Sequence, residues 1–423
     1  MTTRMQNTRA GRHRRSIIRS LCVATAVVVA AAIGGTSYAD PVGAPQVLTP
    51  DRDPFYAPPP NLGAYANGAI LGSRPSALYG LPLPINVWQI QYKSSDADNR
   101  PTTGVTTVMV PDTPWTGAGP RPVVSYQMAE DGLGIQCASS YVLRAGVQAG
   151  LQNGQDPETP VATALLQRNW AVVVSDYEGP QERFLDRDQE AHSNLDGIRA
   201  ALAFAPAALS PSAPVAAFGY SGGAFATAAT MEMQPRYAPE LNVAGFAAGG
   251  IPADLLAAIA MNNGTHNAGL AAIALAALDR LSPEANVAAQ FDDASRTAIA
   301  TASNQCVQQV VNANAGRLLY DASGQSDLAG NPAIQAAAGK QNLGRAVPTA
   351  PMYAWHSGLD DALPLPSTDA LIDRYCAAGA TVSYHRTDVQ GHAAAAVAEI
   401  PAAFDYLNDR LTGRPVQPGC NVF

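Results

Sequence analysis

The chain has 423 residues, with 26 lysines and arginines against 34 aspartates and glutamates, and its formal net charge is −8 at pH 7. Beyond its N-terminal segment it has no cluster of basic residues, so we expect no nucleic acid among its partners. The length exceeds that of one minimal domain and suits a large α/β core that carries an insertion.

The first 39 residues have the three parts of a secretory signal peptide. Six arginines and no acidic residue precede an apolar run at 21–33, and Ser37-Tyr38-Ala39 is a small-x-small cleavage site. The apolar run is too short to span a bilayer comfortably. We expect cleavage before Asp40 and a protein that is secreted or associated with the cell envelope. Sec export, twin-arginine export and retention as a signal anchor all stay open.

Removal of this segment leaves 20 basic and 34 acidic residues, a net charge of −14. It also leaves an even number of cysteines, which in an exported protein predicts two disulfides, with four buried free thiols as the alternative. The spacing allows three pairings of Cys137, Cys306, Cys376 and Cys420.

After a proline- and aspartate-rich segment at 40–76, expected to form an extended arm, strand patterns alternate with helix patterns. This order predicts an α/β fold with a mostly parallel central sheet, helices on both faces, and a hairpin between its first strands. We expect strands at 87–92, 104–111, 122–126, 170–175, 215–218, 351–355 and 381–387, and helices that include 194–204 and 367–378.

Residues 251–345 interrupt this alternation with helical patterns alone. A helical stretch of this length between two strands predicts an inserted domain, a cap or lid, between core segments 40–250 and 346–423. Its alanine- and leucine-rich part fits either tight helix packing or contact with a lipid interface. Helices are expected at 255–260, 268–281, 282–289 and 295–314.

Gly219-Tyr220-Ser221-Gly222-Gly223 lies between the predicted strand 215–218 and an alanine-rich helical stretch at 224–231. A serine at the apex of such a tight turn has a strained backbone, and its neighbours must pack without Cβ atoms. The backbone N–H of Gly222 would then lie at a helix N-terminus, where it can stabilise an oxyanion. The pattern predicts a nucleophilic serine, with an ordinary turn as the alternative.

A serine nucleophile needs a base, and in α/β-hydrolases the order along the chain is serine, carboxylate, histidine. His392 is the candidate base because it follows the last predicted strand, on the side of the sheet where ligands bind in this architecture. We expect His266 to be a solvated loop residue and His385 to be structural. His356 is expected to support the turn that carries the carboxylate.

Two adjacent carboxylates, Asp360 and Asp361, follow the penultimate predicted strand. Asp360 is favoured as the partner of His392, because it lies four residues after His356 and four before Pro364. Asp361 is then expected at the surface or at a helix N-cap. The loop after the strand 122–126 should supply a second oxyanion donor, and Asp131 is the candidate there, with a capping role as its alternative.

Several segments together resemble the secretory lipase family, which is typified by fungal lipase A-type enzymes and has actinobacterial members. The resemblance extends over essentially the whole mature chain, with Ser357 in place of a common glycine. It rests on Asp53-Pro54-Phe55-Tyr56, Ser125-Tyr126-Gln127 with Glu130-Asp131, Ser175-Asp176-Tyr177-Glu178-Gly179, the turn at Ser221, Gly249 to Leu255, and Asp360 to Pro364.

The resemblance implies an α/β-hydrolase fold whose helical lid covers an acyl-binding tunnel. The predicted chemistry of a serine, a histidine and a carboxylate needs no metal or organic cofactor. Carried over to this sequence, the resemblance implies a triad of Ser221, Asp360 and His392, an oxyanion hole at Asp131 and Gly222, and disulfides Cys137–Cys306 and Cys376–Cys420.

These observations predict a secreted serine carboxylic-ester hydrolase, a triacylglycerol lipase or carboxylesterase of lipid degradation. Its expected partners are an acyl-ester or lipid substrate and, through the cap, a lipid interface. A secreted acyltransferase on the same triad and a catalytically weak surface- or lipid-binding protein are the alternatives. Which ester reaches Ser221 depends on residues 251–345.

Overall fold

A computed structural model describes residues 47–78, 83–146, 150–152, 154, 158–321, 328 and 330–423. The predicted signal peptide and its cleavage site lie outside the described residues. The described sheet and the helices of the predicted insertion belong to one compact unit, which begins at Val47.

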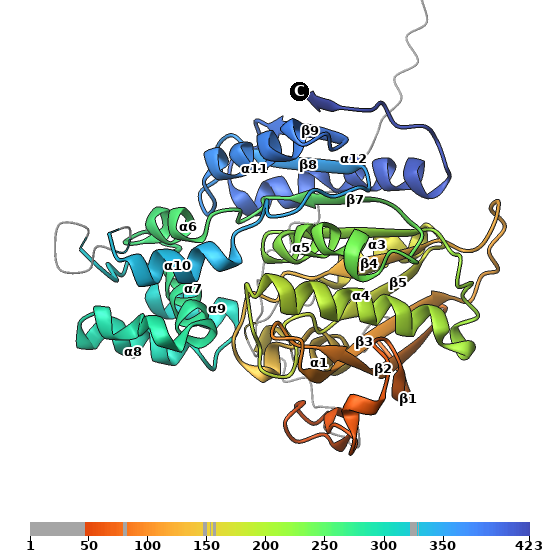
Figure 1. The fold of residues 1–423 in the computed structure, drawn as a ribbon, viewed down its shortest axis with the longest axis horizontal. Helices are drawn as coiled ribbons and strands as arrows, with labels where there is room; N and C mark the ends of the chain where they lie inside the picture. Colours follow the sequence, from red (N-terminus) through yellow and green to blue (C-terminus); the bar gives the residue numbers. More distant parts are fainter. Residues whose placement is uncertain are drawn as a thin grey trace, which may run out of the picture. The chain divides into compact units, whose positions relative to one another are not determined.

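The described strands form one sheet in the order β1-β2-β3-β5-β4-β6-β7-β8-β9-β10, and Figure 1 shows helices on both of its faces. The first three strands run antiparallel as hairpins and join β5, whereas all pairs from β5 to β10 are parallel. The predicted α/β class, with its mostly parallel sheet and initial hairpin, is confirmed. The strands are β1 (Ile70–Ser76), β2 (Ile85–Ser95), β3 (Pro101–Pro111), β4 (Val123–Gln127), β5 (Ala171–Ser175), β6 (Val215–Tyr220), β7 (Val243–Gly249), β8 (Met352–Ser357), β9 (Val382–Thr387) and β10 (Cys420–Val422).

Side chains of the central strands alternate between two apolar layers, one on each face of the sheet. In β5, Val173 belongs to one layer and Val172 to the other, and every residue of this strand is buried. This explains why a continuous apolar run, rather than an alternating one, marks it in the sequence. Helices α4 (Arg187–Ala203), α5 (Gly222–Tyr237) and α11 (Leu365–Ala377) cover the first layer, and α3 (Thr159–Gln167) and α12 (His392–Leu411) cover the second.

The insertion lies between β7 and β8 in the chain and appears at the left of Figure 1. Its first helix begins after Asp254, whose side chain accepts a hydrogen bond of 3.1 Å from the backbone N–H of Ala257. The described helices here are α6 (Leu255–Asn262), α7 (Ala268–Leu281), α8 (Asp293–Ala302), α9 (Val307–Asn314) and α10 (Pro332–Gln341), while α1 (Ser139–Ala145) belongs to the core.

Two of the helices predicted within the insertion are wrong. The expected helix 282–289 consists of two short 3-10 turns, and the expected helix 295–314 is divided into α8 and α9. The division lies at Cys306, which forms a disulfide with Cys137 in the core, with a Cα–Cα distance of 5.5 Å. A second disulfide joins Cys376 to Cys420. The pairing implied by the family resemblance is therefore present.

Three strands were absent from the sequence prediction. Part of the expected arm, Ile70–Ser76, is an edge strand, and Val243–Gly249 is a central one whose glycines and alanines give little β propensity. The region 381–387 was expected to end the sheet, but Cys420–Val422 pairs beside it. In each case, pairing with neighbouring strands overrides a weak local pattern.

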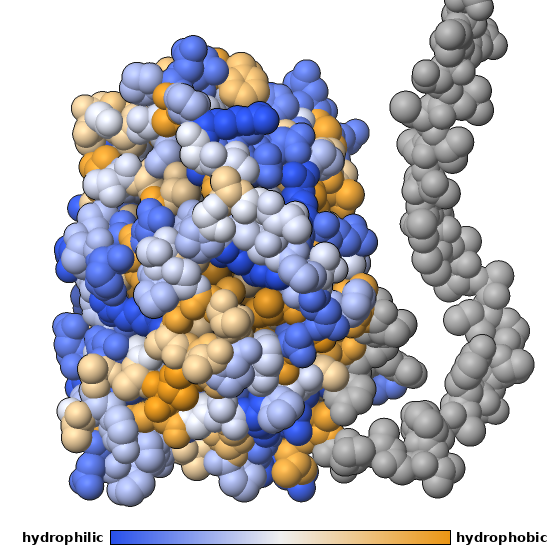
Figure 2. All heavy atoms as spheres, turned by 90° about the vertical axis from the view of Figure 1, so that its right-hand side faces the viewer, coloured by the Kyte–Doolittle hydropathy of each residue, from blue (hydrophilic) through white to orange (hydrophobic). Residues whose placement is uncertain are grey.

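Among the described residues, no helix combines the length and the apolar character required to cross a bilayer. On the face that lies to the right in Figure 1, opposite the insertion, hydrophobic and hydrophilic residues are interspersed (Figure 2).

Candidate active site

Ser221 lies at the junction of β6 and α5 with φ 56° and ψ −125°, a conformation that L-residues rarely adopt. Its backbone N–H donates to the carbonyl of Gly249 at 3.0 Å, which holds the turn against β7. A Cβ atom on Gly223 would lie 2.1 Å from the carbonyl oxygen of Gln127. Close packing therefore requires a glycine at position 223, as the sequence pattern predicted.

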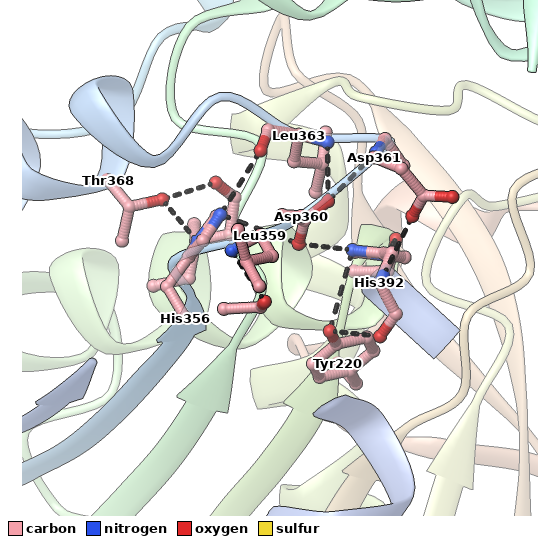
Figure 3. A network of polar contacts seen from close by, with 12 residues as sticks. Tyr220, His356, Leu359, Asp360, Asp361, Leu363, Thr368 and His392 are labelled. Atoms are coloured by element: carbon pink, nitrogen blue, oxygen red, sulfur yellow. Dashed lines mark hydrogen bonds and ion pairs between the residues drawn. The ribbon is translucent and has the colours of Figure 1, made fainter. Parts of the chain in front are cut away.

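Three side chains from separate loops meet at this turn. The hydroxyl of Ser221 and Nε2 of His392 are 2.9 Å apart, and Nδ1 of His392 lies 2.8 Å from Oδ2 of Asp360. His392 is the first residue of α12, and Asp360 lies in the loop between β8 and α11. Figure 3 shows Asp360 and His392 pointing toward each other. The structure thus brings together the three residues that the sequence placed in a triad.

Asp360 is held as an acceptor on both oxygens. Its Oδ2 faces the ring of His392. Its Oδ1 accepts backbone hydrogen bonds from Leu363 at 2.8 Å and Ala362 at 2.9 Å. Burial alone raises the pKa of Asp360, but the hydrogen bond and charge of His392, together with these N–H groups, bring the net pKa below its ordinary value. An ionised Asp360 accepts from Nδ1–H, and this leaves Nε2 of His392 free to accept the serine proton.

Asp361 has a different partner from its neighbour. Its Oδ1 accepts a hydrogen bond of 2.8 Å from the backbone N–H of His392, and its Oδ2 lies 3.3 Å from Nε2 of His266. A carboxylate at the first N–H of α12 is favoured by the helix dipole. The contact matches the N-cap type of role expected for this residue, and His266 is 69% exposed, as expected of a loop residue.

His356 is fully buried next to the loop that carries Asp360 (Figure 3). Its Nδ1 is 3.0 Å from the Thr368 hydroxyl, and its Nε2 is 3.2 Å from the Leu363 carbonyl and 3.5 Å from Oδ2 of Asp360. Burial lowers the pKa of His356, against the opposing charge of Asp360. These contacts fix the turn, in agreement with the expected supporting role. His385 lies in β9 and contacts Glu399 at 2.9 Å, away from the triad.

Asp131 adjoins the first turn of α5 from the loop after β4. A Cβ atom on Gly222 would lie 1.7 Å from Oδ1 of Asp131, so the two predicted oxyanion-hole residues are in direct contact. Burial raises the pKa of Asp131 to about 6, although the charge of His392 opposes this. Its Oδ1 is buried and has no hydrogen-bond partner among the described residues.

An apolar cavity of about 60 Å³ opens at Ser221, Gly222 and Asp131. Its other walls come from the β5–α4 loop, from α6 and α7 of the insertion, and from the loop after Asp360. A larger cavity of about 440 Å³ lies between the N-terminal arm and the core, and its lining contains no member of the triad.

Tyr220 is a residue of the site that the sequence did not single out. Its hydroxyl donates to the carbonyl of His392 at 2.7 Å, and its ring lies against the imidazole with the centroids 4.8 Å apart. Burial, and then the charges of Asp360 and Asp361, raise the pKa of Tyr220, so the hydroxyl stays protonated. Its place beside Ser221 in the turn was the one available signal.

Glu130, Glu178 and Glu182 have the spacing of a metal site among the described residues, with their ligand oxygens within 4.8 Å of one another. Burial raises the pKa of Glu130 to about 8 and also raises the pKa values of the other two. The raised pKa values favour the protonated, uncharged form of these carboxyls, which disfavours metal binding. That the protein needs no metal or cofactor stays a prediction.

Comparison with known proteins gives a consistent family. The model of the secretory lipase family matches residues 152–419. Lipase A of Arthroderma benhamiae is 32% identical over 391 residues, covering 89% of this chain and 82% of the relative. A probable inactive lipase of Mycobacterium tuberculosis is 34% identical over 376 residues, covering 87% and 84%. A secreted triacylglycerol lipase of Malassezia restricta is 29% identical over 384 residues, covering 87% and 81%.

Among solved structures, Candida antarctica lipase A superimposes with a TM-score of 0.81 at 26% identity, over 89% of this chain and 90% of that one. The α/β-hydrolase fold implied by the sequence is thus confirmed, and the implied family is the one whose model matches. This chain belongs to the secretory lipase family.

Proposed function

We propose that the protein is a secreted serine carboxylic-ester hydrolase, a lipase or esterase that acts through an acyl-enzyme on Ser221. The observation that carries the proposal is the continuous chain of contacts from the Ser221 hydroxyl through His392 to Asp360, at 2.9 and 2.8 Å. Family membership and the secreted triacylglycerol lipases among its relatives support the substrate class.

In the first half of the reaction, Oγ of Ser221 bonds to the ester carbonyl carbon while its proton passes to Nε2 of His392. The carbonyl π electrons move onto oxygen, where the backbone N–H of Gly222 and that of Asp131 are the proposed donors. The C–O bond to the alcohol then breaks, and the leaving oxygen takes the proton from His392. The ionised Asp360 stabilises the imidazolium in between.

In the second half, water bonds to the acyl carbon and gives its proton to Nε2 of His392. The bond to Oγ breaks, and Ser221 recovers the proton as the acid leaves. Tyr220 and Asp361, which contact the backbone of His392, are proposed to keep the imidazole between the hydroxyl and the carboxylate throughout.

We also propose cleavage before Asp40 and export, consistent with a family of secretory proteins. N-terminal sequencing of the protein recovered from the medium and from the cell envelope tests this. A mature chain that begins at Met1 in both fractions would contradict it.

One relative is named a probable inactive lipase, so hydrolysis by this chain must be measured rather than assumed. The test is a fluorophosphonate probe together with p-nitrophenyl ester hydrolysis, with Ser221→Ala as the matched variant. We expect labelling and hydrolysis by the wild type, and a loss of about 10⁵-fold or more in kcat for the variant. Folded wild-type protein that neither reacts with the probe nor hydrolyses any ester would favour a binding protein instead.

A further inference from the structure

Helix α7 lies across the candidate active site and is fastened at both ends. Before its N-terminus, the side chain of Asn267 donates to the carbonyl of Asp361 at 3.0 Å. In its last turn, Arg280 donates to the carbonyls of Leu133 at 3.2 Å and Glu182 at 2.7 Å. The first anchor lies in the loop that carries Asp360, and the contact with Leu133 lies two residues after Asp131. Helix α7 therefore crosses the site from the carboxylate of the triad to the predicted oxyanion hole.

The neighbouring helix α6 is fastened to the same loop. Asn262 is buried, and its Nδ2 donates to the carbonyl of Ala362 at 2.7 Å and to that of Ala258 at 2.8 Å. The disulfide Cys137–Cys306 adds a covalent link between the insertion and the core. These contacts fix the positions of α6 and α7 above Ser221.

One face of each helix forms the roof of the cavity. Leu270, Ile273 and Ala274 follow the three- and four-residue spacing of a helix face, and all three line the cavity that opens at Ser221. Ile273 is 1% exposed and therefore has no room to turn away into solvent. From α6, Ile259 closes the cavity in the same way and is fully buried.

The volume beside Ser221 is small for an acyl chain. It is about 60 Å³. By comparison, a cavity of roughly 150 Å³ lined by leucine, isoleucine and phenylalanine holds one benzene molecule. On that scale, the space beside Ser221 takes about two or three carbons beyond the carbonyl carbon before side chains of α6 and α7 must move. The hydrogen bonds of α7 to Asp361 and Glu182 oppose a movement of the helix itself.

We infer that the fixed roof formed by α6 and α7 restricts the enzyme to short acyl esters, with Ile273 as the side chain that sets the limit. The inference rests on the proposed function, because it concerns which acyl group Ser221 receives. It assigns esters of about two to four acyl carbons, including short-chain triacylglycerols, as the substrate class.

The first experiment measures kcat/KM for p-nitrophenyl acetate, butyrate, octanoate and laurate, with emulsions of tributyrin and trioctanoin alongside. Because a methylene that a pocket cannot accommodate costs roughly 10-fold or more, octanoate should be at least about 10-fold slower than butyrate. Octanoate or laurate hydrolysed as fast as butyrate would overturn the inference and leave the proposed function intact. Hydrolysis of no ester of any length would overturn the proposed function itself.

The second experiment changes the roof. Ile273→Ala should raise the octanoate-to-butyrate ratio of kcat/KM by about 10-fold, and Ala274→Leu should lower the butyrate-to-acetate ratio by a similar factor. Leu278→Ala is the matched control, since Leu278 is a fully buried residue of α7 that does not line the cavity. A ratio between two esters does not depend on the folded fraction, so partial misfolding does not obscure the result. Equal ratios in Ile273→Ala, Leu278→Ala and the wild type would refute the role of Ile273.

Discussion

The loops that carry the triad and the helices of the insertion are stabilised in different ways. The triad loops are fixed by short-range backbone contacts, such as those of Leu363 and Ala362 to Asp360. The insertion is fixed by contacts between residues far apart in the chain, such as Arg280 with Leu133 and Cys306 with Cys137. Substitutions in the first region should therefore change chemistry, and substitutions in the second should change stability and substrate choice.

After the loss of Ser221 itself, the largest effect is expected at Asp360. Asp360→Asn keeps the shape of the side chain but removes the charge that stabilises the imidazolium, so kcat should fall by about 10⁴-fold with little change in melting temperature. Ester hydrolysis and thermal unfolding of the same preparation measure both. Asp361→Asn is the matched control one residue away, and a comparable loss of kcat in that variant would show that the two carboxylates share the role.

The disulfides offer a second way to test the difference between the regions. Cys137–Cys306 closes a sequence separation of 169 residues and Cys376–Cys420 one of 44. The chain-entropy model predicts that removing the first, as the double alanine variant, lowers the free energy of unfolding by about 5 kcal/mol, about 1 kcal/mol more than removing the second.

Chemical denaturation of the two double variants measures this difference. The first variant should also lose its selectivity for short esters before it loses its triad chemistry, because Cys306 belongs to the insertion. Equal destabilisation together with unchanged ester ratios in both variants would show that the covalent link does not hold the insertion in place.

The same difference explains what the sequence could and could not predict. Ser221 and His392 could be found because each ends a strand pattern, and the glycines around Ser221 record the tight packing of its turn. The helix Ala268–Leu281 was also predicted with its observed ends. The spacing of its apolar residues is contained within the helix itself, so the local sequence is enough to predict it.

The division at Cys306 and the anchors of Arg280 could not be found in this way, because they depend on residues 98 to 169 positions away. Tyr220 was missed for a related reason, since its contact with His392 joins β6 to α12. Strand β7 has a composition that local propensity disfavours, and only its neighbours make it a strand.

A third prediction concerns pH and the oxyanion side of the site. Burial raises the pKa of Asp131 to about 6, so the folded state holds this proton more tightly than the unfolded chain does. Ionisation of Asp131 therefore lowers the free energy of unfolding. This loss of stability is absent below about pH 4, develops as pH rises from about 4 to 6, and is complete above that range. Asp131→Asn should therefore increase the free energy of unfolding at pH 8 by about 2 kcal/mol relative to its effect at pH 4. Chemical denaturation at both pH values measures this, and the same gain at both would contradict the raised pKa.

The smallest effect is expected at Asp361, which contacts both regions. Its side chain accepts from the backbone N–H of His392 in the core and pairs with His266 of the insertion, while its carbonyl accepts from Asn267. Asp361→Ala removes the first two contacts and should lower the free energy of unfolding by about 1 kcal/mol, the range of a lost helix cap. The fall in kcat should stay below 10-fold, because Asp360 still orients the imidazole.

His266→Ala separates the two contributions, since it removes only an exposed ion pair, which contributes between about 0 and 1 kcal/mol. If Asp361 acts mainly on the core, His266→Ala will change neither the melting temperature nor the octanoate-to-butyrate ratio of kcat/KM appreciably. If it acts mainly on the insertion, both variants will raise the octanoate-to-butyrate ratio together, because the N-terminal anchor of α7 is weakened in each. The carbonyl contact with Asn267 survives either substitution, so we expect the first result, with the roof above Ser221 unchanged.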